Sequence, residues 1–226
     1  MVALSHREMT TEVTAPAKHP VLHHLARFVL RPMFRAYFRM RGEGLGNLPR
    51  RGPFLLAPNH VSMLDWAFVS YFLPRLIRFV VDHTFYDLPV LGFGLRVNGA
   101  IPIRTGRPDA RAMRIAHAVL AAGEPLIVFP EGAISRTGRP QRAQPGVISL
   151  AAATGTPIVP VAVRGAFEAF PRSRRVPRPG RVSVTFGRPL PPPPASGDRH
   201  ERQAQADRLM AHIADLLDRR EPTSPW

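Results

Sequence analysis

The sequence predicts an α/β domain with a mostly parallel central sheet flanked by helices, preceded by an N-terminal amphipathic helical segment. Short apolar runs typical of buried strands alternate with longer amphipathic runs typical of helices over residues 53–186. The 226 residues suffice for one domain with a sizeable core, and an apolar content of 45% argues against a disordered chain.

The chain is expected to begin with a flexible tail over residues 1–19, followed by a helical segment over residues 20–48. Apolar residues recur on one side of the stretch from 20 to 40, and four arginines recur on the other side: Arg27, Arg31, Arg35 and Arg39. Phe38 does not fit this arginine side, and Pro32 should bend the helix or split it. The pattern predicts a membrane-surface helix, with the arginines facing lipid phosphates. An ordinary docked helix with a solvated basic face is the alternative.

The remaining elements follow from apolar runs and turn signals. Strands are expected at residues 53–57, 76–81, 100–103, 126–129, 158–163 and 182–186, and helices at residues 62–73, 108–122, 146–154 and 198–220. The uncharged stretch 143–163 is interrupted by prolines and glycines, so it predicts a short helix and a buried strand rather than a membrane span. Residues 49–190 are expected to form the main domain, and residues 191–226 a proline-rich spacer with a closing helix.

The charge of the chain points to anionic partners. Thirty-one basic residues face 16 acidic ones, for a net charge of +15, and Lys18 is the only lysine. Arginine binds phosphate through two parallel hydrogen bonds, so an anionic membrane, a phosphorylated substrate or a nucleic acid fits this charge. A compositional bias toward arginine is the alternative explanation. The arginines of residues 171–181 suit a nucleic acid, but the chain has no zinc finger, RNA-recognition signature or helix-turn-helix.

Several common sites are excluded by the residues themselves. The chain has no cysteine, so thiolate nucleophiles and thiolate metal sites are ruled out, and no motif recommends a metal. No P-loop is possible, because the motif's lysine is missing, and no G-x-S-x-G nucleophile elbow occurs. A resident cofactor is therefore not expected.

The candidate catalytic pair is His60 and Asp65, which follow a buried strand. On a continuous helix their side chains would point in different directions, so they can meet only if His60 lies in the loop before the first helical turn, where Asn59 or Ser62 can cap the helix. Asp65 would then accept the Nδ1 proton and leave Nε2 free as a base. The spacing alone is weak evidence.

Three further segments carry candidate binding residues. Phe129-Pro130-Glu131-Gly132 ends a strand and is followed by Ser135 and Arg136 in a loop rich in glycine and arginine, which can hold an anion. The strand Ile101-Pro102-Ile103 ends in Arg104. The third segment is Val159-Pro160-Val161. Taken by itself, this apolar stretch predicts only a strand buried in the hydrophobic core.

Taken together and in this order, the motifs resemble those of the glycerolipid acyltransferase family of the 1-acylglycerol-3-phosphate acyltransferase type. Asn59, His60 and Asp65 match N-H-x-x-x-x-D, and Arg104 matches the arginine that ends the second motif. Residues 129–132 match F-P-E-G in full, and residues 159–161 match V-P-V. The chain departs from the family after F-P-E-G: Ala133-Ile134-Ser135-Arg136 stands where Thr-Arg-Ser is common, so the usual phosphate-binding arginine is displaced by two positions.

The resemblance implies transfer of a fatty acyl group from acyl-CoA or acyl-carrier protein to a hydroxyl of a lysophospholipid. The acceptor that it favours is 1-acylglycerol 3-phosphate, and the product is then phosphatidic acid. Glycerol 3-phosphate or another lysolipid is the alternative acceptor, and a basic nucleic-acid-binding protein is the alternative of a different class. His60 would be the base and Asp65 its orienting partner. Arg104, Glu131, Gly132, Ser135 and Arg136 would bind the acceptor, and Pro160 and Val161 the acyl donor or acyl chain. Because residues 1–20 hold no secretory signal, we expect a peripheral protein on the cytoplasmic face of a membrane.

Overall fold

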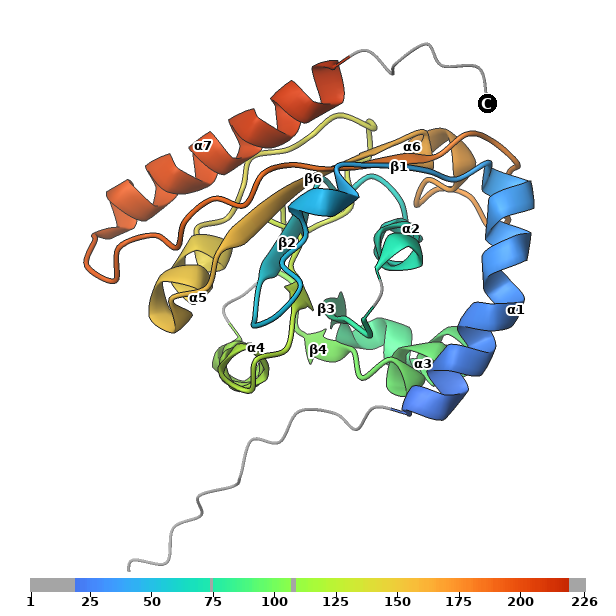
Figure 1. The fold of residues 1–226 in the computed structure, drawn as a ribbon, viewed down its shortest axis with the longest axis horizontal. Coiled ribbons are helices and arrows are strands. Elements are labelled where there is room, and N and C mark those ends of the chain that lie inside the picture. The colour runs from blue at the N-terminus through green and yellow to red at the C-terminus, as the bar shows by residue number, and fades with distance from the viewer. Residues whose placement is uncertain (1–18, 74, 107–108, 220–226) are drawn as a thin grey trace, which may run out of the picture.

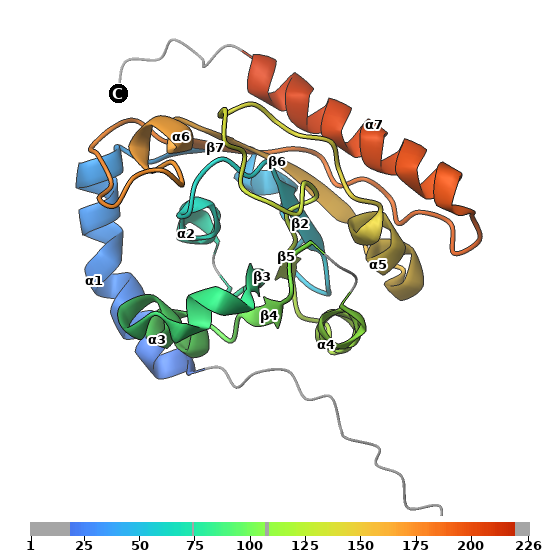
Figure 2. The ribbon, with the colours of Figure 1, turned by 180° about the vertical axis from the view of Figure 1, so that it is seen from behind.

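A seven-stranded sheet runs through the computed structural model, with helices packed on both of its faces (Figures 1 and 2). The structure describes residues 19–73, 75–106 and 109–219. The strands are β1 (Arg41–Glu43), β2 (Leu55–Pro58), β3 (Arg78–Asp82), β4 (Ile101–Ile103), β5 (Leu126–Ile127), β6 (Ile158–Arg164) and β7 (Ser183–Phe186). The α-helices are α1 (Pro20–Phe38), α2 (Asp65–Phe72), α3 (Pro89–Val97), α4 (Ala110–Ala121), α5 (Gly146–Thr154), α6 (Ala166–Ala169) and α7 (Arg199–Asp218), with short 3₁₀ turns η1 (Leu45–Asn47) and η2 (His83–Asp87).

The strand order is β1-β7-β6-β2-β5-β3-β4, and every neighbouring pair is parallel except β6 and β7. The mostly parallel α/β fold predicted from the sequence is therefore confirmed. Because β2, β5 and β4 run in the same direction, the residues after these three strands emerge at the same edge of the sheet.

The hydrophobic core has two layers, one on each face of the sheet. Successive strand residues alternate between them: Leu56 and Ile127 belong to the layer under α1, α2 and α3, and Leu55 and Leu126 to the layer under α4, α5 and α7. Burial on both faces explains why these strands read as continuous apolar runs in the sequence.

Helix α1 is a single continuous helix, although Pro32 lies inside it. Of the two outcomes expected for this proline, a split into two helices is therefore wrong. Phe38, which did not fit the arginine side in the sequence, is buried in the core against Phe68 of α2, with ring centroids 5.0 Å apart. Phe34 lies on the same side of the helix and also contacts Phe68.

Three parts of the fold were not expected from the sequence. Residues 89–97 form α3, although Gly92 and Gly94 are typical of loops. A Cβ at Gly92 would lie 2.2 Å from the carbonyl oxygen of Tyr86, so this glycine allows close packing of α3 on η2 rather than breaking the helix. The helical segment expected to reach residue 48 ends at Phe38, residues 41–43 form the edge strand β1, and residues 166–169 form α6.

No helix among the described residues is both long and apolar enough to cross a membrane. The stretch 143–163, which lacks charge, contains α5 and most of β6, as expected. The tail expected over residues 1–19 lies outside the described residues except for its last position.

Candidate active site

The order of the strands brings the two principal motifs together. His60 follows β2, and the Phe129–Gly132 motif follows β5. These two strands are parallel neighbours, with Leu56 beside Ile127. Side chains that leave the carboxyl ends of adjacent parallel strands lie at one edge of the sheet, where α/β folds commonly bind ligands.

His60 and Asp65 form the hydrogen bond expected from their spacing. The His60 turn (residues 59–65) precedes α2, and Asp65 is the first residue of that helix. The Nδ1 atom of His60 lies 2.9 Å from Oδ2 of Asp65. The same oxygen accepts hydrogen bonds of 2.7 Å from the backbone N–H groups of Val61 and Ser62. These contacts close the turn, so a histidine and an aspartate five residues apart can meet.

The hydrogen-bonding pattern identifies the tautomer of His60. A carboxylate can only accept hydrogen bonds, so the proton between the two side chains belongs to Nδ1 of the imidazole. Nε2 of the neutral ring then carries a lone pair and can act as a base. Asp65 is fully buried, whereas the His60 side chain is 16% exposed, so the histidine is partly accessible while its orienting partner is shielded.

The His60 ring packs directly on the loop after β5. Its centroid lies 3.8 Å from that of the Phe129 ring, and the two planes are 18° apart. The backbone N–H of Ser135 also donates to the carbonyl oxygen of His60 over 2.7 Å. The imidazole and the loop 129–136 therefore belong to one site, as the sequence motifs require.

Glu131 joins the two loops through both of its carboxylate oxygens. Oε1 accepts from the backbone N–H of His60 at 2.9 Å. Oε2 accepts from the backbone and side-chain nitrogens of Gln141, at 3.0 and 3.2 Å. Burial raises the pKa of the Glu131 carboxyl, and these hydrogen bonds oppose the increase. Glu131 was predicted to help bind the acceptor; in the structure both of its oxygens accept hydrogen bonds from within the protein, one of them from the backbone of His60.

Neighbouring polar side chains hold the other side of the turn. Asn59 does not cap α2; its side chain accepts from the N–H of Val163 at 2.7 Å and donates to the carbonyl of Val163 at 3.1 Å. Ser62 does bond near the helix start, because its Oγ accepts from the N–H of Leu64 at 3.2 Å and donates to the carbonyl of Phe170 at 2.7 Å. The turn is thus tied to β6 and to the end of α6.

The other predicted acceptor-binding residues differ in their distance from His60. Ser135 is buried and its Oγ donates to the carbonyl of Arg139, so its side chain closes the loop rather than facing a substrate. Gly132, with a φ of 72°, and Arg136 are exposed in the same loop. Arg104 is also exposed, but it follows β4, three strands from β2, which amounts to roughly 14 Å at the usual strand spacing.

Pro160 and Val161 lie in the centre of the sheet. Pro160 pairs in register with Ala57 and Val161 with Pro58, and all four residues are buried. The carbonyl of Val161 accepts a hydrogen bond of 3.3 Å from the N–H of Asn59. The expectation that these two side chains contact an acyl chain is therefore replaced by a supporting role, because they are enclosed by the neighbouring strands and hold the residue before His60.

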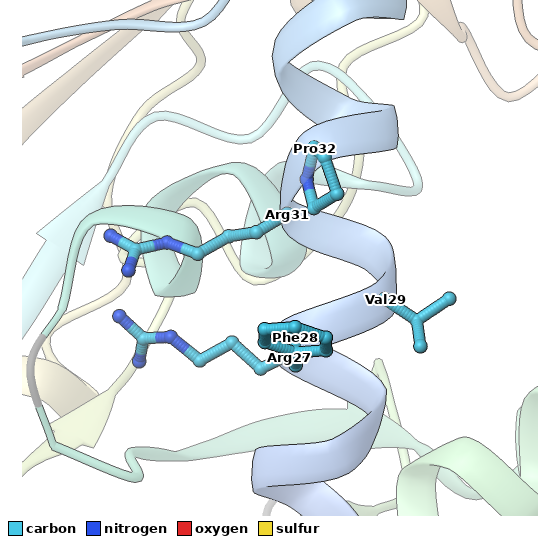
Figure 3. Close-up of a pocket in the computed structure, with 5 residues that line it drawn as sticks. All are labelled: Arg27, Phe28, Val29, Arg31 and Pro32. Atoms are coloured by element: carbon cyan, nitrogen blue, oxygen red, sulfur yellow. The ribbon is translucent and has the colours of Figure 1, made fainter.

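The arginines of α1 do not share one environment. Arg27 and Arg31 point to the same side of the helix, and Val29 points away from them (Figure 3). The guanidinium of Arg31 lies 5.3 Å from the centre of the Tyr71 ring of α2. Burial lowers the pKa of Arg27, and the charge of Arg31 lowers it further. All four arginines were predicted to face a membrane; Arg27 is half-buried, Arg31 is exposed but lies against Tyr71 of α2, and Arg35 and Arg39 are exposed.

Several apolar residues of α1 are exposed. Val21, Leu25, Phe28, Val29 and Met33 are each more than half exposed. Arg27, Arg31, Phe34 and Phe38 fall within about 60° around the helix axis, so the arginines continue the stripe that docks on the protein. This arrangement explains why Phe38 broke the pattern expected of a solvated basic face.

Some contributors to the site could not be found by motif. Gln141 binds Glu131 and also donates to the carbonyl of Ala133 at 3.0 Å, yet it lies ten residues beyond Glu131 in a loop without regular spacing. The stacking of Phe129 on His60 likewise depends on the adjacency of β2 and β5, which no local pattern encodes.

Fold and site together define a class of protein: an α/β domain with a buried aspartate that orients a single histidine at the carboxyl edge of a parallel sheet. Comparison with known proteins agrees with this class. A family model described as Acyltransferase matches residues 39–164, more than half of the chain. The chain therefore belongs to the acyltransferase family.

Named relatives extend the comparison. The chain is 25% identical over 179 residues to the chloroplastic 1-acyl-sn-glycerol-3-phosphate acyltransferase LPAT1 of Arabidopsis thaliana, covering 77% of this chain and 50% of that protein. It is 26% identical over 172 residues to the chloroplastic enzyme BAT2 of Brassica napus, covering 74% and 50%. The chain thus spans about half the length of these curated relatives.

A solved structure shares the fold. The crystal structure of the 1-acyl-sn-glycerophosphate (LPA) acyltransferase PlsC from Thermotoga maritima superposes with a TM-score of 0.73 at 25% sequence identity. The match covers 89% of this chain and 81% of that one.

Proposed function

We propose that this protein transfers a fatty acyl group from a thioester donor, acyl-CoA or acyl-carrier protein, to the free hydroxyl of 1-acylglycerol 3-phosphate, giving phosphatidic acid. The observation that carries the proposal is the hydrogen bond between Asp65 and Nδ1 of His60, in a turn packed on the loop after β5. The names of the plant and Thermotoga relatives support this acceptor.

The reaction needs a base because an alcohol is a poor nucleophile at neutral pH. Nε2 of His60 takes the proton of the acceptor hydroxyl as its oxygen attacks the thioester carbonyl carbon. The carbon–sulfur bond then breaks, the thiolate leaves, and the proton on Nε2 passes to its sulfur. The buried carboxylate of Asp65 holds the ring and stabilises the imidazolium that forms between these steps. The substrate supplies the nucleophile, so no acyl-enzyme is formed.

The acceptor phosphate is held by arginine. Arg136 is exposed, and it directly follows Ser135, whose N–H binds the carbonyl of His60, so its guanidinium can lie beside the reacting hydroxyl. Arg104, at the same sheet edge but farther along, forms the outer part of the acceptor site. Exchange of Arg136 for glutamine should raise the acceptor KM more than the same change at Arg104.

Contact with an anionic membrane surface brings both amphiphilic substrates to the site. The exposed apolar side of α1 inserts among the lipid chains, with Arg35 and Arg39 near lipid phosphates. The membrane contact is peripheral and at the cytoplasmic face.

The decisive experiment measures acyl transfer by His60→Ala with labelled acyl-CoA and lysophosphatidate. The variant should lose a factor of about 10²–10⁴ in kcat while keeping the melting temperature of the wild type, because base catalysis alone contributes this much. Activity close to that of the wild type in a folded variant would refute the mechanism. Glycerol 3-phosphate and other lysophospholipids, offered in the same assay, identify the acceptor.

A further inference from the structure

The segment 171–181, between α6 and β7, concentrates positive charge beside the site. It carries Arg172, Arg174, Arg175, Arg178 and Arg181, and the chain has no acidic residue between Glu168 and Asp198. Among the described residues, none of these five guanidinium groups forms an ion pair with a carboxylate. The local charge of the segment is therefore not neutralised within the described protein.

The segment is held in place by its backbone. The N–H of Arg174 donates to the carbonyl of Pro171, and the N–H of Arg178 to that of Ala169. Tyr37 of α1 binds it twice, because its hydroxyl donates to Pro177 at 3.0 Å and its carbonyl accepts from Gly180 at 3.1 Å. An arginine-bearing loop fixed in this way presents its charges with little loss of conformational entropy on binding.

The segment is also connected to the catalytic pair. Ser62 donates through its N–H to Asp65 and through its Oγ to the carbonyl of Phe170, the residue just before the segment. The loop that carries Arg136 packs on the same region, since a Cβ at Gly138 would lie 2.8 Å from the ring of Phe167 in α6. The arginines therefore stand at the rim of the site rather than at its centre.

One guanidinium atom of the segment is buried without a partner in the described part of the chain, as is Nη1 of Arg202 in α7. Nη1 of Arg174 is buried and has no hydrogen-bond partner among the described residues. A buried donor without a partner is costly, and an anionic oxygen that reached it would remove the cost. A flat anionic surface does not reach a buried atom easily, so a small ligand that enters between side chains fits better.

We propose that the segment 171–181 binds the phosphate groups of a coenzyme A thioester, the diphosphate and the ribose 3′-phosphate. This inference rests on the proposed function, because it identifies the donor of that reaction. The pantetheine arm of such a donor separates its thioester from its phosphates, so a phosphate site at the rim allows the carbonyl carbon to reach His60. Clustered arginines match clustered phosphates through paired, charge-assisted hydrogen bonds.

The test compares the triple variant R172Q/R174Q/R175Q with the control R111Q/R114Q/R208Q. The control removes the same charge from exposed positions of α4 and α7, on the other face of the sheet. Binding of coenzyme A is measured by calorimetry on the full chain, and the KM for acyl-CoA is measured in neutral detergent micelles, which remove the effect of an anionic bilayer.

The triple variant should bind coenzyme A at least about tenfold more weakly and show a similar rise in the KM for acyl-CoA. Its kcat, acceptor KM and melting temperature should stay near the wild-type values, and the control should change by less than about twofold. Dephospho-coenzyme A should bind the wild type several-fold more weakly than coenzyme A, and this comparison needs no variant that must fold.

Other results would overturn the inference. These are equal binding of coenzyme A by the wild type and the triple variant, equal binding of coenzyme A and dephospho-coenzyme A, or loss of binding to anionic vesicles alone. A wild type that uses only acyl-carrier protein would overturn it too. Coenzyme A binding that depends on the segment, in a protein without transferase activity, would instead refute the proposed function and leave the inference standing.

Discussion

The His60 turn and helix α1 differ in how many of their side chains form hydrogen bonds or ion pairs within the protein. In the turn, Asp65 accepts three hydrogen bonds, Asn59 makes two with Val163, and Glu131 accepts three from the two loops that it joins. On α1, Phe28 is 80% exposed, and Arg27 and Arg31 have no carboxylate partner among the described residues.

This difference separates two kinds of function. A turn held by hydrogen bonds to Oδ2 of Asp65, to Asn59 and to Glu131 keeps an imidazole in one orientation, which catalysis requires, although Oδ1 of Asp65 is buried without a partner among the described residues. A helix that leaves large apolar side chains in water is stabilised by contact with something outside the chain, and the proposed bilayer is such a contact. The closing helix α7 is a useful contrast, because it has a capping box at Asp198 and Glu201 and buries its apolar side against the sheet.

The largest expected effect is that of Asp65→Asn. An asparagine can offer an N–H to the ring, so it favours the tautomer with the proton on Nε2 and removes the base. We expect kcat to fall by a factor of about 10²–10⁴ with little change in the KM for either substrate. Steady-state kinetics on a variant shown to be folded by circular dichroism measures this, and an unchanged kcat would mean that the Asp65 carboxylate does not orient His60.

The next effect concerns the apolar side of α1. The variant L25Q/V29Q/M33Q should bind anionic vesicles at least about 100-fold more weakly, because burying each of these side chains contributes about 1.5–3 kcal/mol. Its free energy of unfolding in solution should change by less than about 1 kcal/mol, since all three side chains are exposed. Vesicle sedimentation and urea denaturation provide the two measurements, with M113Q on α4 as a control. Full vesicle binding by the triple variant would exclude α1 as the contact.

Glu131→Gln should lower kcat by about tenfold, because glutamine keeps one acceptor for His60 but cannot accept twice from Gln141.

Since burial raises the pKa of Glu131 above its ordinary value of 4.5, the native state binds this proton more tightly than the unfolded chain. The contribution of the carboxyl to stability is therefore greatest below the ordinary pKa and decreases as pH rises through the raised one.

The pH dependence of this variant follows from that sign. The wild type should lose stability relative to Glu131→Gln as pH rises from 4.5 toward the raised pKa, and the difference should then level off. Thermal melts of both proteins across this range provide the measurement. A difference that is constant with pH would show that Glu131 does not titrate between the native and unfolded states as expected.

The smallest effect distinguishes the two pairs of arginines on α1. R35Q/R39Q should weaken binding to anionic vesicles by several-fold at moderate salt and by more at low salt, because screening reduces the contribution of each arginine below the roughly 1 kcal/mol that it makes close to such a surface. R27Q/R31Q should weaken it less, since these side chains point toward α2 (Figure 3). A larger effect of the second pair would mean that α1 turns its inner side to the membrane.

The sequence predicted the local features of the fold well. The strand at 158–163 appears as β6, residues 146–154 form α5 with the expected ends, and the helix expected at 198–220 is α7. Apolar runs and turn residues are local signals, and here the tertiary packing agreed with them. Helix α3 was not predicted because glycine is typical of loops. The reason for Gly92 is its close contact with the backbone of Tyr86, which only the tertiary structure shows.

What the sequence determined by itself is the inventory and the short-range geometry: a histidine and an aspartate that can bond only across a turn, a strand that ends in Phe129-Pro130-Glu131-Gly132, and a large excess of arginine. Only the tertiary structure decided which strands are neighbours, and therefore that Phe129 stacks on His60 while Arg104 lies three strands away. It also decided that Glu131 bonds to His60 and Gln141, and that Arg31 lies against Tyr71 of α2. The reason is physical: periodicity and spacing encode contacts within a few residues, whereas strand order and helix docking arise from packing between segments far apart in the chain.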